Sequence, residues 1–392
     1  MNFCAVICEY NPFHNGHKHQ LGEMKAATGD KILCIMSGNF TQRGEAAVFD
    51  KYTRARHAVE NGADVVIELP AAFAVCSAEL FASGAVHILS SIPSVKTLAF
   101  GSESGTKESF LAAARALNSE DKEFKAALKE KMKDGTSYIR ARNAVLLESG
   151  ADVDEALLAS PNNILGTEYC RALLAKKSDI EPLPLKRVGS GYADTDLEKN
   201  FSSAAALRAV LGEQGKKERK ALKGNLPASV FADVERYRAL PFGEIALCAL
   251  ELAAAEEIAL TPDCSEGLEN KLKSLARSNP EYADMLKKAV SKRYTLARLR
   301  RILVQNLLKI KLKDVRAFLA APLYCNVLAV KKDGAEETLS ALAGAFPTVV
   351  RKSDYSSLKK EALDCFNLDI RADALYSALS GEYINDFLTQ FV

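Results

Sequence analysis

The sequence predicts an α/β protein with a doubly wound parallel sheet of the Rossmann type, followed by a helical, basic domain and a small C-terminal α/β region. In the first half of the chain, short β-rich apolar runs alternate with segments of helical periodicity. Residues 226–315 show only helical patterns, and an apolar run returns at 326–331. The 392 residues exceed one core of about 250 to 300 residues. We therefore predict domains at 1–213, 214–315 and 316–392.

The first predicted strand is the apolar run at residues 3–7. Asn11-Pro12 breaks this run, and Leu21 and Met24 resume it at helical spacing. A strand, a tight turn and the N-terminus of a helix therefore follow one another. Backbone amides at a helix N-terminus favour phosphate.

Later segments continue the alternation of strands and helices. Further strands are expected at 31–36, 64–69, 95–101 and 181–188, and helices at 50–61 and 78–90. Residues 106–149 are predicted to be entirely helical. Ser160-Pro161 is a strong helix start, with a hydroxyl at the N-cap and proline at the first helical position.

The loops after the parallel strands are predicted to converge. Carboxyl ends of parallel strands lie along one edge of the sheet, and ligands bind there, where the strand order reverses. The loop after the first strand, the loop at 37–45 and the loop that begins at Gly101 all belong to this edge. We expect Asn162 and Asn163, in a first helical turn, to face the same place.

Two histidines stand in the first turn after the first strand, in the string His14-Asn15-Gly16-His17. Side chains three residues apart on a helix can point the same way, and Gly16 has no Cβ to obstruct a phosphate. Imidazole, neutral or protonated, can donate hydrogen bonds to the negative oxygens that develop when an α-phosphate becomes five-coordinate. The pattern predicts that His14 and His17 are catalytic.

A strand followed by His-x-Gly-His resembles the signature of the HIGH-type nucleotidyltransferase superfamily, whose members attack the α-phosphate of ATP or CTP. Two further strings extend the likeness, namely Met36-Ser37-Gly38-Asn39-Phe40-Thr41-Gln42-Arg43-Gly44-Glu45 and Ser160-Pro161-Asn162-Asn163-Ile164-Leu165-Gly166. Together with Glu9-Tyr10-Asn11-Pro12-Phe13-His14-Asn15-Gly16-His17 they are similar to the bacterial tRNA(Met) cytidine acetate ligase family. These motifs span roughly the first half of the chain.

The resemblance implies an ATP-dependent ligase. ATP and acetate would give acetyl-adenylate and pyrophosphate, and the acetyl group would pass to the exocyclic amine of the wobble cytidine of elongator tRNA(Met), giving N4-acetylcytidine. Mg²⁺ would travel with ATP without a metal site of the protein's own. The implied ATP-binding residues are Ile7, Cys8, Glu9, Tyr10, Asn11, Pro12, Phe13, His14, Asn15, Gly16, His17, Lys18, His19, Gln20, Gly101, Asn162, Asn163, Arg187 and Arg208.

Residues 201–208 resemble the superfamily's second motif, a serine-rich helix start that ends in an arginine and holds the β- and γ-phosphates. Many relatives have a threonine near the position of Ala204 and Ala205. In this chain Ser202, Ser203 and the backbone amides are left to make the hydroxyl and amide contacts.

The second predicted domain carries a local excess of positive charge. Residues 245–260 and 268–277 have helical patterns, and residues 287–313 contain ten Lys or Arg and no acid. A helix at 291–308 would pack its leucines and present cations to phosphate. A solvated surface helix is the alternative interpretation. The arginines expected to hold the tRNA backbone are Arg293, Arg298, Arg300 and Arg301.

Composition points to an ordinary soluble globular protein. The net charge is +2, no apolar run approaches the roughly 18 residues of a membrane span, and the start of the chain lacks a basic leader. We expect a cytoplasmic protein. Its nine scattered cysteines include no CxxC pair and are interpreted as reduced and mostly buried. Cys4 and Cys8 belong to a strand interior, which argues against a zinc set with the histidines.

The residue pattern alone leaves the attacking group open. It contains no dedicated nucleophile with a base beside it, so direct attack by a bound substrate on the α-phosphate is favoured over a covalent intermediate. One alternative is an adenylyltransferase that acts on a small phosphorylated acceptor, which would not need a basic helical region. A second is a non-catalytic RNA-binding protein that keeps a nucleotide fold.

Overall fold

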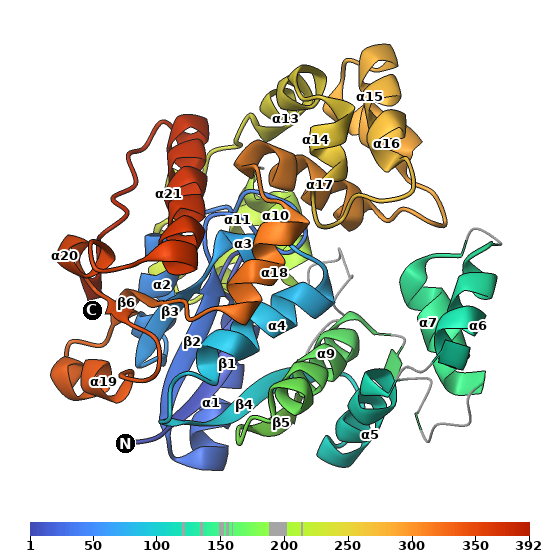
Figure 1. The fold of residues 1–392 in the computed structure, drawn as a ribbon. Helices are drawn as coiled ribbons and strands as arrows, with labels where there is room; N and C mark the ends of the chain where they lie inside the picture. Colours follow the sequence, from blue (N-terminus) through green and yellow to red (C-terminus); the bar gives the residue numbers. More distant parts are fainter. Residues whose placement is uncertain are drawn as a thin grey trace.

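The computed structural model describes residues 1–392 except 120–121, 134–135, 149–152, 154–156, 159, 188–201 and 213–214 (Figure 1). The predicted boundary between the first two domains and Phe201 of the second motif lie outside the described residues. The three-domain division stays a prediction.

Within the described residues, eight strands form one sheet, in the order β5-β4-β1-β2-β3-β6-β7, with β8 beside β6. The strands are β1 (Phe3–Cys8), β2 (Lys31–Ser37), β3 (Val65–Leu69), β4 (Val95–Ser102), β5 (Glu181–Lys186), β6 (Cys325–Val330), β7 (Thr348–Val349) and β8 (Gln390–Phe391). All strands expected from the sequence are present, with ends shifted by one or two residues.

The centre of the sheet is β1, whose residues are all buried. It pairs in parallel with β2 on one side and β4 on the other, and β5 continues in parallel beyond β4. The chain therefore runs outward from β1 through β2 to β3 and then returns to the other side of β1. This reversal confirms the doubly wound parallel sheet and creates a crevice at the carboxyl ends of β1 and β4.

The strands of the C-terminal α/β region join the main sheet and do not form a separate layer. β6 pairs antiparallel with β3, and Val65 lies opposite Val330. All six residues of β6 are buried. An apolar strand of this kind is stable when both of its faces are buried. Pairing with the free edge of β3 buries β6 in the core of the main sheet.

The helices of the N-terminal half agree with the predicted periodicity. They are α1 (Asn15–Thr28), α2 (Lys51–Glu60), α3 (Ala71–Ala74), α4 (Ala78–Leu89), α5 (Lys107–Asn118), α6 (Lys122–Lys133), α7 (Tyr138–Glu148), α9 (Pro161–Lys176) and α10 (Ala204–Leu211). Where residues 106–149 are described, they are helices and their connections, as expected. In Figure 1, α6 and α7 project to one side of the sheet.

The second half is mainly helical and ends with a long helix. Its helices are α11 (Lys216–Asn225), α12 (Ala228–Ala232), the 3-10 turn Val234–Arg236, α13 (Phe242–Leu252), α14 (Ala255–Ala259), α15 (Leu268–Ser278), α16 (Tyr282–Ala289), α17 (Leu296–Leu308), α18 (Leu312–Ala320), α19 (Ala335–Ala341), α20 (Lys352–Tyr355) and α21 (Lys360–Ser380). Figure 1 shows α13 to α16 grouped at the top of the molecule and α21 on the opposite side from α6 and α7.

Two helix boundaries differ from the sequence prediction. The pattern at 245–260 is interrupted at Ala253, where the ammonium of Lys273 binds the carbonyl oxygens of Leu250, Glu251 and Ala253. A cation on these last carbonyls ends the helix without a glycine or a proline. The basic helix begins at Leu296 because the Thr295 hydroxyl accepts the N–H of Arg298 and caps it.

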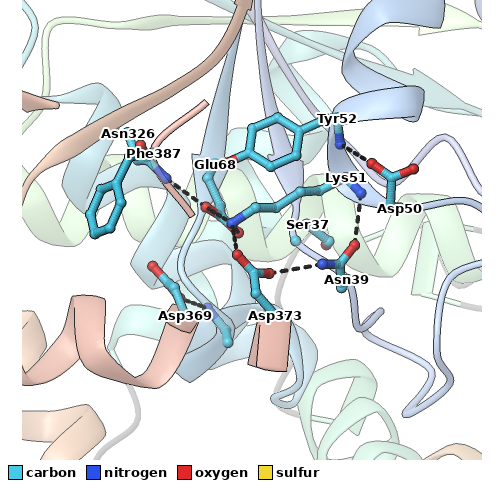
Figure 2. A network of polar contacts seen from close by, with 12 residues as sticks. Ser37, Asn39, Asp50, Lys51, Tyr52, Glu68, Asn326, Asp369, Asp373 and Phe387 are labelled. Carbon is cyan, nitrogen blue, oxygen red and sulfur yellow. Dashed lines mark hydrogen bonds and ion pairs between the residues drawn. The ribbon is translucent and has the colours of Figure 1, made fainter. Parts of the chain in front are cut away.

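A buried ionic network fixes the C-terminal helix to the first strands (Figure 2). Lys51, at the start of α2, lies 2.8 Å from Glu68 of β3 and 2.6 Å from Asp373 of α21, and all three side chains are at most 2% exposed. The other oxygen of Asp373 accepts from Asn39, and Asn326 of β6 donates to Glu68. The network therefore holds the loop after β2 against α21.

Candidate active site

A cavity opens at the carboxyl ends of β1, β4 and β5. Its volume is about 210 Å³, whereas a second hollow beside Val48 has about 30 Å³, room for little more than a water molecule. The larger cavity is therefore the candidate ligand site. Its lining includes Ile7, Cys8, Glu9, Tyr10, Asn11, His14, Gly16, His17, His19, Gln20, Gly101, Asn162, Arg187 and Arg208.

His14 and His17 form a stacked pair at the start of α1. Their ring centroids are 3.6 Å apart and the rings are inclined by 24°. His14 is the N-cap, and its Nδ1 accepts the N–H of Gly16 at 3.1 Å. The Nδ1 of His17 accepts the N–H of His14 at 3.3 Å. The two histidines thus replace the serine and glutamate of an ordinary capping box.

These contacts decide which nitrogen of each ring carries the proton. Since both Nδ1 atoms accept from backbone N–H groups, the proton of each neutral ring is on Nε2. Burial and the nearby Arg187 and Arg208 lower the pKa of His14 to about 3. Burial and His14 lower the pKa of His17 well below its usual value. Both side chains are therefore neutral Nε2–H donors at physiological pH, not imidazolium ions.

Two arginines from different segments, one after β5 and one in α10, line the cavity. Arg208 of α10 donates to the carbonyl oxygen of Asn11 at 2.8 Å and lies 3.8 Å from a carboxylate oxygen of Glu45. Arg187 directly follows β5. A Cβ at Gly101 would lie only 3.1 Å from Cγ of Arg187, so the missing side chain lets the arginine cross the end of β4.

The start of α10 places hydroxyls at the same edge. Ser203 is the N-cap and its hydroxyl accepts the N–H of Ala206 at 3.1 Å. Ser202, Ser203, Ala204 and Ala205 all line the cavity. The described part of the motif at 201–208 therefore faces the cavity that contains the two histidines.

The two asparagines of the string at 160–166 have different positions. Asn163 is fully buried, and its amide binds the Ser102 hydroxyl at 3.0 Å, the N–H of Glu103 at 3.1 Å and the Ser104 hydroxyl at 3.0 Å. It holds the loop after β4. Asn162 donates to the Glu103 carboxylate and lines the cavity. Of the two asparagines expected at the site, Asn162 is therefore the one that lines the cavity.

Four residues of the predicted ATP-binding run are absent from the described cavity lining: Pro12, Phe13, Asn15 and Lys18. Phe13 is fully buried in the core, and Asn15 donates to the carbonyl oxygen of Gly224 at 2.9 Å. Pro12 is also buried, and Lys18 is exposed. The side chains of this run are therefore divided between core, cavity and surface, which a continuous run of predicted contacts overlooks.

The lining also contains residues that were not predicted as contacts. Thr41, Gln42, Arg43 and Glu45 come from the loop after β2, and Tyr169 comes from α9. This loop belongs to the string at 36–45 that carries the family resemblance. Its place directly after a strand was a signal that could have predicted these contacts. Tyr169 has no comparable signal in the sequence.

Glu9 places a carboxylate at the end of β1. Its Oε1 accepts the N–H of Gln42 at 2.6 Å. Burial raises its pKa, although the hydrogen bond from Gln42 and the cations Arg208, Arg43 and Arg54 oppose that shift. Glu9 therefore joins the first strand to the loop after the second.

The arginines predicted to bind RNA have acidic or polar partners from other segments. Arg300 pairs with Glu45, and Arg293 lies 2.7 Å from Glu266. Arg298 donates to the carbonyl oxygen of Asp263 and to the hydroxyl of Ser265. The absence of acids in the local sequence therefore does not mean an absence of acids in space.

Arg301 is placed where it cannot serve as predicted. Its side chain is 10% exposed and makes two hydrogen bonds with Asp263, at 3.0 and 2.9 Å, and a third with the carbonyl oxygen of Gln42 at 3.3 Å. An arginine held in this way is unavailable to a phosphate backbone, which argues against its predicted RNA contact. Exposed cations of the same segment are Lys287, Lys288, Lys292, Lys309 and Lys313.

The described residues include no cluster of three or more His, Cys, Asp or Glu that could hold a metal ion. Their cysteines are free, and all except Cys248 are buried. No helix in the described part of the chain has the length and apolar character needed to cross a membrane.

Comparison with known proteins identifies the family. The model of the HIGH nucleotidyl transferase family matches residues 1–389. A tRNA(Met) cytidine acetate ligase of Clostridium novyi is 36% identical over 406 aligned positions, which cover 99% of this chain and 98% of that protein. The chain belongs to the tRNA(Met) cytidine acetate ligase family. A second ligase of this name, from Clostridium acetobutylicum, is 34% identical. The alignment covers 97% of this chain and 96% of that protein.

Solved structures agree with this assignment to the ligase family. Apo TmcAL of Thermotoga maritima superposes with a TM-score of 0.92, at 30% identity over 100% of both chains. The form of that protein bound with alpha-thio ATP gives a TM-score of 0.89, also over 100% of both chains. The family resemblance and the fold class predicted from the sequence are confirmed.

Proposed function

We propose that this protein activates acetate with ATP to form acetyl-adenylate and then acetylates the wobble cytidine of elongator tRNA(Met). The observation that carries the proposal is the stacked pair His14 and His17, two neutral Nε2–H donors at the crevice where the strand order reverses. The names of the relatives and the ATP analogue bound by the Thermotoga maritima protein support it.

The first step places the α-phosphate of ATP beside the two imidazoles. An acetate oxygen attacks the phosphorus, a bond to the acetate oxygen forms, and pyrophosphate leaves. Negative charge grows on the non-bridging oxygens of the five-coordinate phosphorus, and preorganised N–H donors stabilise that charge. Neutral donors suit this task because their protonation does not change during the step.

Arg187 and Arg208 supply the positive charge that the phosphates need. Both residues line the cavity, Arg187 directly after β5 and Arg208 from α10, and the charges of both act on His14. Ser202 and Ser203, at the start of α10, offer hydroxyl and amide groups to the terminal phosphates. Mg²⁺ is proposed to enter with ATP, because the described residues offer it no cage of their own.

The RNA backbone is proposed to meet the cationic helices α16 and α17. Lys287 and Lys288 of α16 and Lys292, between α16 and α17, are exposed, and Arg298 of α17 is partly buried. Arg300 pairs with Glu45, which itself lies at the cavity and 3.8 Å from Arg208. The proposed RNA surface is therefore directly connected to the proposed ATP site. The cytoplasmic location expected from the sequence stays a prediction.

One incubation tests the whole proposal. Purified protein is mixed with ATP, labelled acetate and elongator tRNA(Met), and the RNA is digested to nucleosides. Labelled N4-acetylcytidine that depends on ATP is the expected product. Acetate-independent consumption of ATP with a small phosphorylated acceptor, and no label in RNA, would refute the proposal in favour of an adenylyltransferase.

A further inference from the structure

The two proposed half-reactions differ in their need for a base. Acetate attacks as an anion, so adenylate formation releases no proton. Cytidine attacks through its N4 amine, which must lose a proton when the amide forms. A group that accepts this proton is required only in the second half-reaction, and its identity can be sought among the residues of the cavity.

The histidines cannot accept that proton. The Nδ1 lone pairs of His14 and His17 are occupied by backbone N–H groups, and Nε2 of each neutral ring already carries hydrogen. Their lowered pKa values also make them very weak bases. The base must be a different side chain.

The carboxylates among the described lining residues are Glu9, Glu23 and Glu45. Glu45 forms an ion pair with Arg300 and, more loosely, with Arg208, so its two carboxylate oxygens are already engaged by cations. Glu23 is exposed on α1, two turns beyond the histidine pair. Glu9 differs from both, since it stands at the end of β1, beside the turn that positions His14.

The position of Glu9 fits a proton acceptor. Only part of its surface is exposed, and Oε1 is occupied by the N–H of Gln42 at 2.6 Å. This contact fixes the carboxylate and leaves Oε2 as the oxygen that can receive a proton. The peptide carbonyl of Glu9 accepts from Arg54 at 2.7 Å, so the backbone is fixed as well.

We propose that Glu9 is the general base of acetyl transfer, which rests on the proposed function. The N4 nitrogen attacks the acetyl carbonyl carbon, the C–N bond forms, and the bond between that carbon and the phosphate oxygen of AMP breaks. AMP leaves with the electron pair of that bond. The N4 proton passes to Oε2 of Glu9 and then to solvent.

The raised pKa of Glu9 is consistent with this role. Burial makes the carboxylate a stronger base than an exposed glutamate, and a base works best when its pKa is near the working pH. Since only the ionised form accepts a proton, the transfer rate falls as the pH falls through this pKa.

The two half-reactions can be measured separately. Acetate-dependent exchange of pyrophosphate with ATP reports adenylate formation. Transfer is measured from synthetic acetyl-adenylate to elongator tRNA(Met), in single turnover. Glu9→Gln keeps an oxygen to accept from Gln42 and removes the base, whereas Glu9→Asp keeps a carboxylate. Folding of each variant is checked by thermal unfolding.

We expect Glu9→Gln to slow transfer by about 100-fold or more. Because Glu9 also lines the ATP cavity, adenylate formation falls as well, but by at least about tenfold less than transfer. Glu9→Asp should recover part of the transfer rate, and the acid limb of the wild-type pH profile should disappear in Glu9→Gln. Equal losses in both half-reactions, or transfer at the wild-type rate, would overturn the inference. Failure of the wild-type protein in both assays would instead overturn the proposed function.

Discussion

In each histidine of the pair, one ring nitrogen caps the helix and the other is assigned to catalysis, and substitution can remove either role alone. In His17, Nδ1 receives the backbone N–H of His14 at 3.3 Å, and Nε2–H is assigned to the α-phosphate. The amide of asparagine is as far from Cβ as Nδ1, and the amide of glutamine reaches about as far as Nε2. His17→Asn therefore keeps the cap and loses the donor, and His17→Gln does the reverse.

The magnitudes follow from the two contacts. Loss of one preorganised donor to a developing anion costs about 10² to 10³ in rate, or about 3 to 4 kcal/mol. Loss of a capping acceptor costs about 1 kcal/mol of stability. His17→Asn should therefore slow adenylate formation at least 100-fold with nearly unchanged stability. His17→Gln should keep more activity and unfold at a lower denaturant concentration.

Pyrophosphate exchange and urea unfolding measure these two effects on the same samples. His14 offers the same pair of substitutions, because its Nδ1 caps Gly16 in the same way. A more active asparagine variant at either position would refute the role assigned to Nε2–H. That role would also be refuted if all four variants lost activity only in proportion to their loss of stability.

The remaining predictions concern stability, RNA binding and pH. Lys51→Met should cost about 3 to 5 kcal/mol because two buried carboxylates lose their cation, whereas Lys31→Met, at a pair with 31% and 11% exposure, should cost no more than about 1 kcal/mol. Neutralising Lys287 and Lys292 should weaken tRNA binding and flatten its salt dependence without slowing pyrophosphate exchange. Adenylate formation should show no histidine titration between pH 6 and 8, because the pKa of His14 is about 3. The same shift predicts that stability is lost as the pH falls below about 6.5, where the unfolded chain takes up protons that folded His14 excludes.

Each of these outcomes has a matched check. Chemical unfolding compares the two lysine variants, and equal destabilisation would contradict the importance assigned to the buried network. Filter binding at several salt concentrations tests the RNA surface. An unchanged slope of log affinity against log salt concentration would remove α16 and the segment between α16 and α17 from that surface. A change in the pyrophosphate exchange rate that follows the titration of a group with a pKa near 6.5 would contradict the claim that His14 and His17 are neutral.

The sequence was sufficient where structure depends on neighbouring residues. The strand at the start of the chain, the break at Asn11-Pro12 and the helix of His14 and His17 follow from local periodicity, and the structure has them in place. The parallel sheet and its reversal followed from the alternation of strands and helices. Topology therefore predicted the edge of the sheet at which the cavity opens.

The sequence was insufficient where partners come from distant segments. The acids that hold Arg300 and Arg301 lie more than 30 positions away, so a local count of charges could not find them. The antiparallel place of β6 depends on the free edge of β3. The difference between Asn162 and Asn163 depends on a loop about 60 residues earlier. This loop surrounds the Asn163 amide and meets Asn162 through the Glu103 carboxylate.

The central claim is that an acetate oxygen attacks the α-phosphorus of ATP in the cavity of His14 and His17. Acetate labelled with ¹⁸O at both oxygens, supplied with ATP and elongator tRNA(Met), tests it directly by mass spectrometry of the AMP released. Attack by acetate places one ¹⁸O atom in the phosphate of each AMP formed by acetyl transfer. AMP without ¹⁸O, formed together with acetylated tRNA, would contradict it.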